Sequence, residues 1–288
     1  MSWQFAIIGH SLLSAVSIII ARKLSIKNNK YGYGIILLLF SAILTLGVLA
    51  NIFFIDDKIS IPTKNIYLLL LFCGGLLFAL RNYLIFEFYN RLSASVGVIV
   101  SILNTLAVVL FATLILGESL TIIQYFGALL MLASIYVVSV KPLKKDILKH
   151  KQGIIIGLLN AAIFGLAITN EKYLLNEIGT GNYLIFGWGF QLVGAVILSL
   201  LNRKKVHFPE GRNMALLVAY VLFFAIGGAL FIASLVGSDN ASQVASLSGL
   251  KVVFTVILGY VLLKERQNTQ KVVIGSILAF LGLFFLFL

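Results

Sequence analysis

The sequence has few charged residues and almost no cysteine. Only 11% of its 288 residues are charged, whereas a soluble domain has about 25%, and the mean hydropathy is +1.06. An ordinary soluble domain is therefore excluded. Cys73, the single cysteine, lies inside an apolar run, which excludes both a disulfide framework and a cysteine metal cluster.

Catalytic motifs are also missing. The sequence contains no HExxH pair, no nucleophile elbow, no P-loop and no paired aspartates in an apolar run. We therefore expect no enzyme, no cofactor and no metal site. A basic segment before the first apolar run and a small-residue cleavage site after it are both absent, so we expect that run to be retained rather than removed as a signal peptide.

Long apolar runs fill nearly the whole chain. A hydrocarbon core of about 30 Å requires about 20 apolar residues per helix, and ten runs meet that length. We therefore predict an all-α integral membrane protein with ten transmembrane helices. The predicted spans are 3–24, 33–54, 65–88, 93–116, 121–140, 153–175, 182–201, 213–237, 241–263 and 270–288.

Basic residues occur mainly in alternate loops. The net charge is +12, but 17 of the 22 Lys and Arg residues lie in odd-numbered loops, and the even-numbered loops hold only Lys58, Lys64 and Lys172. This distribution indicates membrane topology rather than a nucleic-acid surface. We predict a multi-pass protein of a prokaryotic inner (plasma) membrane, with odd-numbered loops in the cytoplasm and both termini outside.

The chain contains an internal repeat. Residues 93–118 align with 240–265 at an offset of 147, so that Ser101 matches Ser248 and Glu118 matches Glu265. We predict a first five-helix repeat at 1–140, a basic cytoplasmic connector at 141–152 and a second repeat at 153–288. An odd number of helices per repeat inverts the second copy, and equivalent loops show opposite charge bias, as inverted-repeat carriers with alternating access require.

Several short motifs extend this argument. LILGESL and VLLKERQ close the fourth and ninth spans, GGLLF at 74–78 matches GGALF at 227–231, and NEKYLL, from Asn170, ends the sixth span. With these features the chain resembles the drug/metabolite transporter superfamily in its ten-helix, EamA-type form. The resemblance implies a cavity lined by spans 1, 3, 4, 6, 8 and 9, and export or exchange of small metabolites such as amino acids.

Lys251 is the residue whose insertion into a membrane is expected to cost the most free energy. It lies ten residues inside the ninth span, where insertion of an ammonium costs about 2.5 to 3.5 kcal/mol. Our main interpretation is that Lys251 meets an anionic group of the substrate. The alternatives are an ion pair with Glu87 or Glu171, or an uncharged lysine.

Polar neighbours complete the predicted site. Ser248 and Thr255 share a helical face with Lys251, and the first repeat offers Ser101 and Asn104 at the same depth. Arg81 has the fork geometry that suits carboxylate or phosphate, although a snorkelling side chain explains it nearly as well. The predicted substrate-binding residues are Lys251, Asn104, Ser248, Ser101, Arg81 and Tyr83.

Four further residues are candidates for coupling or gating: His10, Glu171, Asn160 and Glu87. His10 either accepts a coupling proton or is bonded to a neighbouring helix, and Glu171 either pairs with Lys172 or gates the cavity. Glu118 and Glu265 are predicted to cap the helices that follow them, spans 5 and 10. Small residues every four positions, from Gly153 to Gly165, predict a close helix contact along span 6.

We therefore expect an alternating-access exporter or exchanger of a small polar metabolite, anionic or zwitterionic, such as an amino acid. Its expected partners are the small-molecule substrate, the lipid bilayer and a candidate coupling proton, with no nucleic acid, and it acts as a monomer or homodimer. The alternatives are a channel and a non-transporting membrane receptor or scaffold. The short loops disfavour a receptor, and no ring of charge favours a channel.

Overall fold

A computed structural model describes residues 3–27, 32–55, 58–118, 121–139, 147–201, 206–208, 210–264 and 269–287. Within these ranges every regular element is helical. Nine segments are long and apolar enough to cross a membrane, and the apolar part of the segment at the fifth predicted span, Ile122–Val137, is shorter. The predicted all-α membrane fold with ten helical segments is confirmed.

The ten segments follow the predicted order. Six are single α-helices: α1 (Trp3–Lys27), α3 (Asn65–Arg91), α6 (Ile122–Ser139), α7 (Ile147–Ile178), α10 (Arg212–Gly237) and α13 (Thr269–Phe287). The other four are composite. They are α2 (Gly32–Ala50) with η2 (Asn51–Ile55); α4 (Ala94–Val100) with α5 (Leu103–Phe111) and η3 (Ala112–Leu116); α8 (Thr180–Asn182) with η5 (Tyr183–Gly187) and α9 (Trp188–Leu201); and α11 (Ala241–Ser248) with α12 (Lys251–Leu262).

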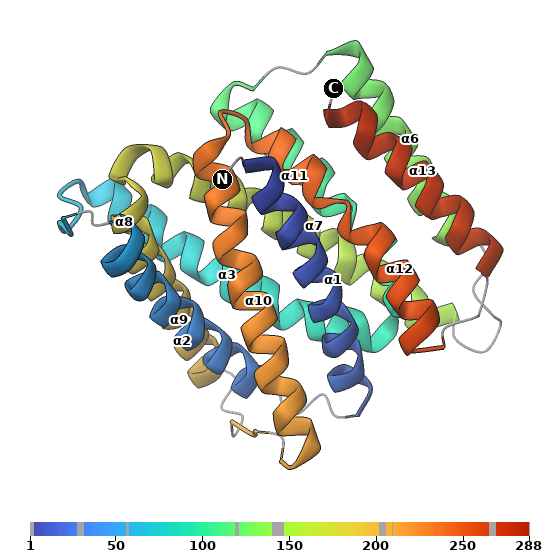
Figure 1. Cartoon of the computed structure of the whole chain (residues 1–288), viewed down its shortest axis with the longest axis horizontal. Coiled ribbons are helices and arrows are strands. Elements are labelled where there is room, and N and C mark those ends of the chain that lie inside the picture. The colour runs from blue at the N-terminus through green and yellow to red at the C-terminus, as the bar shows by residue number, and fades with distance from the viewer. Residues whose placement is uncertain are drawn as a thin grey trace.

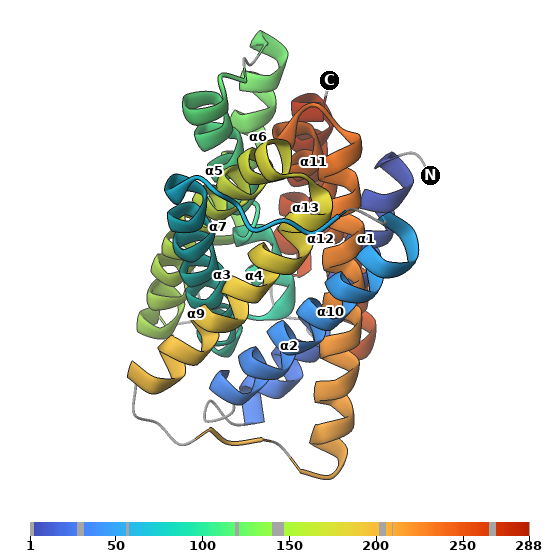
Figure 2. The ribbon, with the colours of Figure 1, turned by 90° about the vertical axis from the view of Figure 1, so that its left-hand side faces the viewer.

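Each helix packs against a partner from the other half of the chain. The main pairs are α1 with α10, α3 with α7, α2 with α9 and α6 with α13, and α4 and α5 contact α12 and α11. Figure 1 shows α6 and α13 on one flank and α2 and α9 on the opposite flank, with α1, α3, α7 and α10 between them. Figure 2 shows the same arrangement from the side. Reciprocal pairing of this kind is what an inverted repeat produces.

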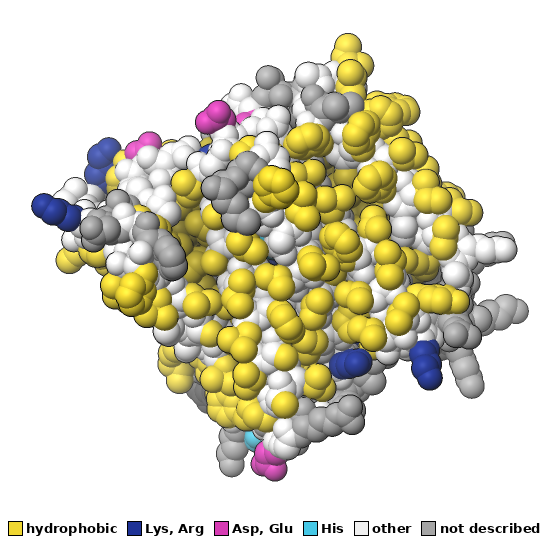
Figure 3. Space-filling model, in the orientation of Figure 1, with side chains coloured by type: hydrophobic (Ala, Val, Ile, Leu, Met, Phe, Trp, Pro, Cys, Tyr) yellow, Lys and Arg dark blue, Asp and Glu magenta, His cyan; other side chains and the backbone are white. Residues whose placement is uncertain are grey.

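The surface matches a lipid environment. Hydrophobic side chains cover the middle of the face seen in Figure 3, whereas charged side chains gather towards its two ends. Large apolar residues are widely exposed, among them Leu69, Leu114 and Ile277. We call the two ends the even-loop end, where both termini and the even-numbered loops lie, and the odd-loop end.

The small-residue face of the sixth span makes the predicted close contact. A Cβ atom added to Gly165 would lie 2.7 Å from the backbone carbon of Ala107, so only glycine allows α7 to approach α5 this closely. α7 is also longer than predicted, because it begins at Ile147 and includes the described part of the expected connector. Residues 141–146 lie outside the described ranges, and the division into repeats at these boundaries stays a prediction.

The fourth and ninth spans are each interrupted near their middle, which the sequence interpretation missed. α4 ends at Val100 and α5 begins at Leu103, while α11 ends at Ser248 and α12 begins at Lys251. At the repeat offset of 147 the two interruptions agree to within one residue. Both expected helices, 93–116 and 241–263, are therefore divided, and Ser248 lies on a different half-helix from Lys251, whereas Thr255 follows Lys251 by one turn in α12.

Candidate functional site

The two interruptions share one local geometry. The backbone tightens from i→i+4 to i→i+3 hydrogen bonds, as in Ile102 N–H to Ile99 C=O at 3.1 Å and Leu250 N–H to Leu247 C=O at 3.1 Å. In each, a serine hydroxyl donates to the carbonyl three residues earlier. Ser101 donates to Val98 at 2.7 Å, and Ser248 donates to Ala245 at 2.7 Å. The hydroxyl hydrogens of both predicted site serines therefore bond the backbone of the interruption, and their remaining lone pairs face no described donor.

Other helices stabilise the second interruption. The hydroxyl of Ser11 in α1 is shared between the carbonyls of Ile7 at 2.9 Å and Ser248 at 3.2 Å, and Thr105 of α5 donates to the carbonyl of Ala245 at 3.3 Å. The end of α11 is thus satisfied by side chains of the first half, because a buried carbonyl without a donor is costly. The interruption before Lys251 is therefore stabilised by hydrogen bonds from the first half.

A cavity lies between the halves at the level of the interruptions, and the space along its wall, open solvent included, is about 1120 Å³. Its wall extends from Ala21 and Tyr89 on the odd-loop side to Glu171 and Ile232 on the even-loop side. Eight of the predicted site residues line it: His10, Arg81, Ser101, Asn104, Asn160, Glu171, Ser248 and Lys251. Besides the spans implied by the family resemblance, α2 and α9 contribute wall residues.

Lys251 is the first residue of α12 and faces this cavity. Within the described ranges its ammonium has no ion pair and no hydrogen bond: Glu87 pairs with Arg91, and Glu171 is bonded by Tyr183. The ion-pair alternative is therefore not what the structure shows. A cation at the positive end of a helix is disfavoured, so this placement adds to the cost of burying the charge.

Arg81 is the second cation of the cavity. Its guanidinium lies 4.7 Å from the ring centroid of Phe164 and 6.0 Å from that of Phe224, and one of its nitrogens donates to Asn82 at 3.4 Å. Its Nε has no partner. The snorkelling alternative is wrong, because the aromatic rings of α7 and α10 hold the guanidinium inside the protein. Arg81 is close enough to Lys251 for the two charges to interact.

Two buried amides present unused groups on the same wall. Asn104 and Asn160 are each only 4% exposed. Their side-chain oxygens are buried and lack a hydrogen-bond partner. The hydroxyl of Tyr220, also on the wall, is buried and unpartnered as well. Buried polar groups without partners are rare in proteins, and their position on a cavity wall is suited to contact with cavity contents.

Both ring nitrogens of His10 are hydrogen bonded. Its Nδ1 lies 2.8 Å from the carbonyl of Gly227, and its Nε2 lies 3.2 Å from the hydroxyl of Ser14. Because a carbonyl only accepts, Nδ1 carries the proton and Nε2 accepts from Ser14. This is the helix-to-helix hydrogen bond that we considered as the alternative to proton coupling.

Glu171 and Lys172 make hydrogen bonds to different parts of the protein. The Tyr183 hydroxyl donates to Glu171 at 2.7 Å, whereas the ammonium of Lys172 donates to the carbonyls of Leu235 and Ser238 at 2.8 and 2.7 Å. Of the two alternatives for Glu171, the pair with Lys172 is therefore wrong. Lys172 instead neutralises the C-terminal end of α10, and Glu171 is left facing the cavity.

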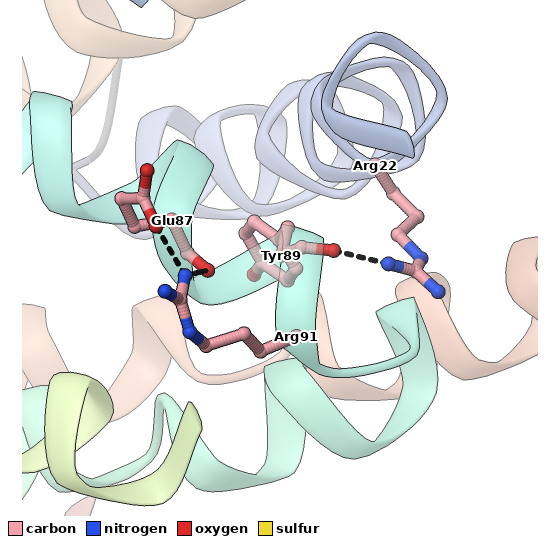
Figure 4. Close-up of polar contacts among 4 residues, drawn as sticks. All are labelled: Arg22, Glu87, Tyr89 and Arg91. Atoms are coloured by element: carbon pink, nitrogen blue, oxygen red, sulfur yellow. Dashed lines mark hydrogen bonds and ion pairs between the residues drawn. The ribbon is translucent and has the colours of Figure 1, made fainter. Parts of the chain in front are cut away.

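Tyr83 and Glu87 do not line the cavity. Tyr83 stacks on Tyr33 with ring centroids 4.9 Å apart. Figure 4 shows Arg91 in contact with both the carboxylate and the carbonyl of Glu87, and Arg22 of α1 donating to the Tyr89 carbonyl of α3. These contacts lie at the odd-loop end, where the Tyr89 contact links α1 to α3.

Glu118 caps a different helix from the one predicted. Its carboxylate accepts the backbone N–H groups of Ala241 and Ser242 at 2.9 and 3.1 Å, and also the Ser242 hydroxyl. It therefore caps α11, which belongs to the other repeat, and not the helix that follows it. Glu265 lies outside the described residues.

Sequence reasoning missed three aromatic residues of the cavity wall: Phe164, Tyr220 and Phe224. Trp188 and Gln191, which were weaker candidates from the sequence, line the same cavity. In a chain with 22 Phe and 11 Tyr, aromatic residues carry no local signal that separates the cavity wall from the core. The interruptions did leave one signal, the Ser248–Gly249 pair inside an apolar span, since Gly/Ser pairs are common sites of helix kinks.

Comparisons with known proteins agree with this architecture. Residues 1–140 and 151–288 each match the model of the EamA-like transporter family. A solved structure described only as a crystal structure of a protein is similar, with 17% identity, a TM-score of 0.71, and coverage of 98% of this chain and 95% of that chain. At this identity the likeness concerns the fold alone. No curated protein matches the sequence.

Proposed function

We propose a substrate class and a mechanism for this chain, which belongs to the EamA-like transporter family and is therefore a multi-pass membrane transporter of small molecules. The substrate is a small metabolite with an anionic group, and the chain exports or exchanges it by alternating access. The observation that carries this proposal is the ammonium of Lys251, which faces the cavity without a partner among the described residues.

Three features make Lys251 the anion contact. It begins a half-helix, so backbone N–H groups and the helix dipole add positive potential at the same place. Arg81 is near enough to contribute a second cation. Discontinuous helices with charged ends near the membrane midplane are a recurring way for inverted-repeat carriers to bind substrate. Asn104, Asn160 and Tyr220 provide neutral polar contacts on the same wall.

One contact between the halves suits alternating access. At the even-loop end, Glu118 of the first half holds the N-terminus of α11 in the second half, and we propose that this contact keeps that end of the cavity closed. Opening the even-loop end then requires the hydrogen bonds of Glu118 to break. These bonds therefore stabilise the state in which that end is closed.

Transport in liposomes tests the proposal. A thermal-shift screen of carboxylates and phosphates identifies a ligand, and counterflow of that labelled ligand is then measured. A carrier shows saturable uptake stimulated by the same compound on the opposite side, whereas a channel shows no such stimulation and a scaffold transports nothing. We expect Lys251→Ala to abolish uptake, and Lys58→Ala, at an exposed loop lysine, to leave it unchanged.

The closure at Glu118 is tested separately. In a Cys73→Ser background, Ile232→Cys places one thiol at the inner limit of the even-loop end. We expect Glu118→Gln to raise its labelling by an impermeant thiol reagent from that end several-fold. The control Asp239→Asn removes a neighbouring carboxylate outside this contact and is expected to change nothing. Equal labelling rates in the two variants would contradict this part of the mechanism.

The proposal also covers the membrane in which the protein lies and its oligomeric state. The charge distribution supports an inner (plasma) membrane location with both termini outside, and each monomer contains a complete cavity, so a monomer is sufficient and a homodimer is compatible. His10 remains a candidate for a coupling proton, since the Ser14 hydroxyl can accept a hydrogen bond from a protonated ring as well as donate one.

A further inference from the structure

The cavity wall at the level of the interruptions carries hydrogen-bond acceptors that no described donor satisfies. The side-chain oxygens of Asn104 in α5 and Asn160 in α7 are buried and have no partner within the described ranges, and both residues line the cavity. Ser101 and Ser248 line the same wall. Because their hydroxyl hydrogens are donated to the backbone, each serine oxygen has only lone pairs left to offer.

The two asparagines lie at the same level on neighbouring helices. A Cβ atom added to Gly157 of α7 would lie 2.9 Å from a side-chain carbon of Val100, and one added to Gly165 would lie 2.7 Å from the backbone carbon of Ala107. α7 and the fourth span therefore run side by side in the same direction, and both asparagines fall between these two contacts. Amide oxygens from two adjacent helices thus belong to one region of the cavity wall.

These oxygens require donors that the described protein does not supply. An amide oxygen can accept two hydrogen bonds, and a buried polar group without a partner destabilises the folded state. Leucine, which has nearly the shape of asparagine, would avoid this cost at either position. The cost is offset when a molecule in the cavity brings hydrogen-bond donors to this region.

The charges of the cavity favour a neutral donor. Lys251 and Arg81 line the same cavity and are close enough for their charges to interact. An ammonium group bound by the two amide oxygens would be repelled by both cations, since like charges inside a protein interact strongly. A hydroxyl group offers the hydrogen that the oxygens need without this repulsion.

We propose that Asn104 and Asn160 form a hydroxyl-binding subsite, so that the transported acid also carries one or more hydroxyl groups. Ser101 and Ser248 provide acceptors for a further hydroxyl at the same level. The substrate class is thereby narrowed from anions in general to hydroxy acids. The anionic half of this inference rests on the proposed function, whereas the hydroxyl half rests on the unpartnered amide oxygens.

Ligands that differ at one group test the inference. Propanoate, lactate and alanine carry a hydrogen, a hydroxyl and an ammonium on the same carbon, and succinate, malate and aspartate repeat this comparison on a dicarboxylate. Hexanoate and gluconate compare no hydroxyl with several. Calorimetry measures the affinity of the purified full chain for each compound, in wild type, Asn104→Leu, Asn160→Leu and Lys251→Ala.

The matched control is Asn170→Leu. Asn170 is another amide of α7, but its nitrogen donates to the carbonyl of Leu70 at 3.0 Å, and it is not part of the described cavity wall. Because this substitution removes a hydrogen bond, it should lower the melting temperature of the protein and leave the relative affinities of the ligands unchanged.

The expected result is selective. Wild type binds at least one hydroxy acid at least about tenfold more tightly than the acid without the hydroxyl, because a site built to bond a hydroxyl rejects analogues that lack it. Asn104→Leu and Asn160→Leu each remove most of this preference, while affinity for the unsubstituted acid stays within about twofold. Their melting temperatures without ligand stay the same or rise, since each loses an unpaired buried group.

Three outcomes overturn the inference. In the first, no hydroxy acid binds wild type more tightly than its unsubstituted partner. In the second, the amino acid of a series binds most tightly and the asparagine variants remove that preference, which assigns the subsite to an ammonium group. In the third, both asparagine variants keep the wild-type ratio between hydroxy and unsubstituted acids, whatever their melting temperatures.

Failure of the proposed function is recognised separately. Lys251→Ala should weaken the hydroxy acid and the unsubstituted acid alike, so that the ratio of their affinities survives. Undiminished binding of both compounds by Lys251→Ala would contradict the role of the lysine, and the ratio would still report on the hydroxyl subsite.

Discussion

The interruptions of the fourth and ninth spans have the same backbone geometry and different chemistry. Ser101 and Ser248 make equivalent hydrogen bonds to carbonyls three residues earlier, yet the half-helix that follows contains Asn104 in one repeat and begins with Lys251 in the other. All four residues line the cavity, but the repeated serines donate their hydroxyl hydrogens to the backbone, so duplication accounts for the scaffold. Divergence after duplication accounts for the charge of the site.

The largest effect is expected when this difference is removed. Lys251→Asn makes the two interruptions equivalent at the position that differs most. We expect affinity for the anionic ligand to fall at least about 100-fold, since loss of one partner of a buried charge pair costs about 2 to 5 kcal/mol. Calorimetric titration measures this, with Lys58→Asn as a surface control that should bind normally.

Moving the lysine to the other repeat sharpens the comparison. In the double variant Lys251→Asn with Asn104→Lys, the ammonium returns to the cavity on the pseudo-symmetric half-helix. We expect affinity to recover by about tenfold from the single Lys251→Asn variant, because a charge of the same sign again lies near Arg81. A double variant as weak as the single one would show that the position of the charge, and not its presence in the cavity, is decisive.

Arg81→Gln tests whether one cation is sufficient. The guanidinium is held between aromatic rings rather than by a helix interruption, and we expect its loss to weaken anion binding by about tenfold, less than the loss of Lys251. The control Arg91→Gln removes a guanidinium that pairs with Glu87 outside the cavity and should leave affinity unchanged. An effect of Arg81→Gln exceeding that of Lys251→Asn would reverse the assignment of the main contact.

The smallest effects are expected for the residues that stabilise the interruption. Thr105→Val and Ser11→Ala each remove one hydrogen bond to a carbonyl at the end of α11, and each should lower stability by about 1 kcal/mol. Thermal unfolding measures the change. Since neither hydroxyl is proposed to contact substrate, affinity should change less than twofold, and a larger change would mean that the interruption itself adjusts on binding.

The helical fold could be read from the sequence because the membrane imposes it. Every backbone polar group must be satisfied inside the hydrocarbon region, so hydropathy alone located all ten helical segments, and an odd number per repeat required inversion. The interruptions were not found, since their residues are helical in character and the tightening involves only a few backbone hydrogen bonds at each position.

The chemistry of the site was less predictable for a geometric reason. Neighbouring helical residues do not face one another, and Glu171 and Lys172, whose pairing was one alternative, in fact bond to different helices. Glu118 was assigned to its own following helix, whereas its partners lie more than 120 residues away. Lys251, Arg81 and Asn104 were found because polar residues inside apolar spans are conspicuous, but Tyr220 and Phe224 gave no comparable signal.

The central claim is that the ammonium of Lys251 binds the anionic group of the substrate. The most direct measurement compares the affinity of a bound carboxylate with that of its uncharged amide, for wild type and for Lys251→Met, which preserves side-chain length without charge. We predict that the wild type prefers the carboxylate by at least about 100-fold and that Lys251→Met lowers this preference to at most about tenfold, the part that Arg81 supplies. An unchanged preference in Lys251→Met would contradict the claim.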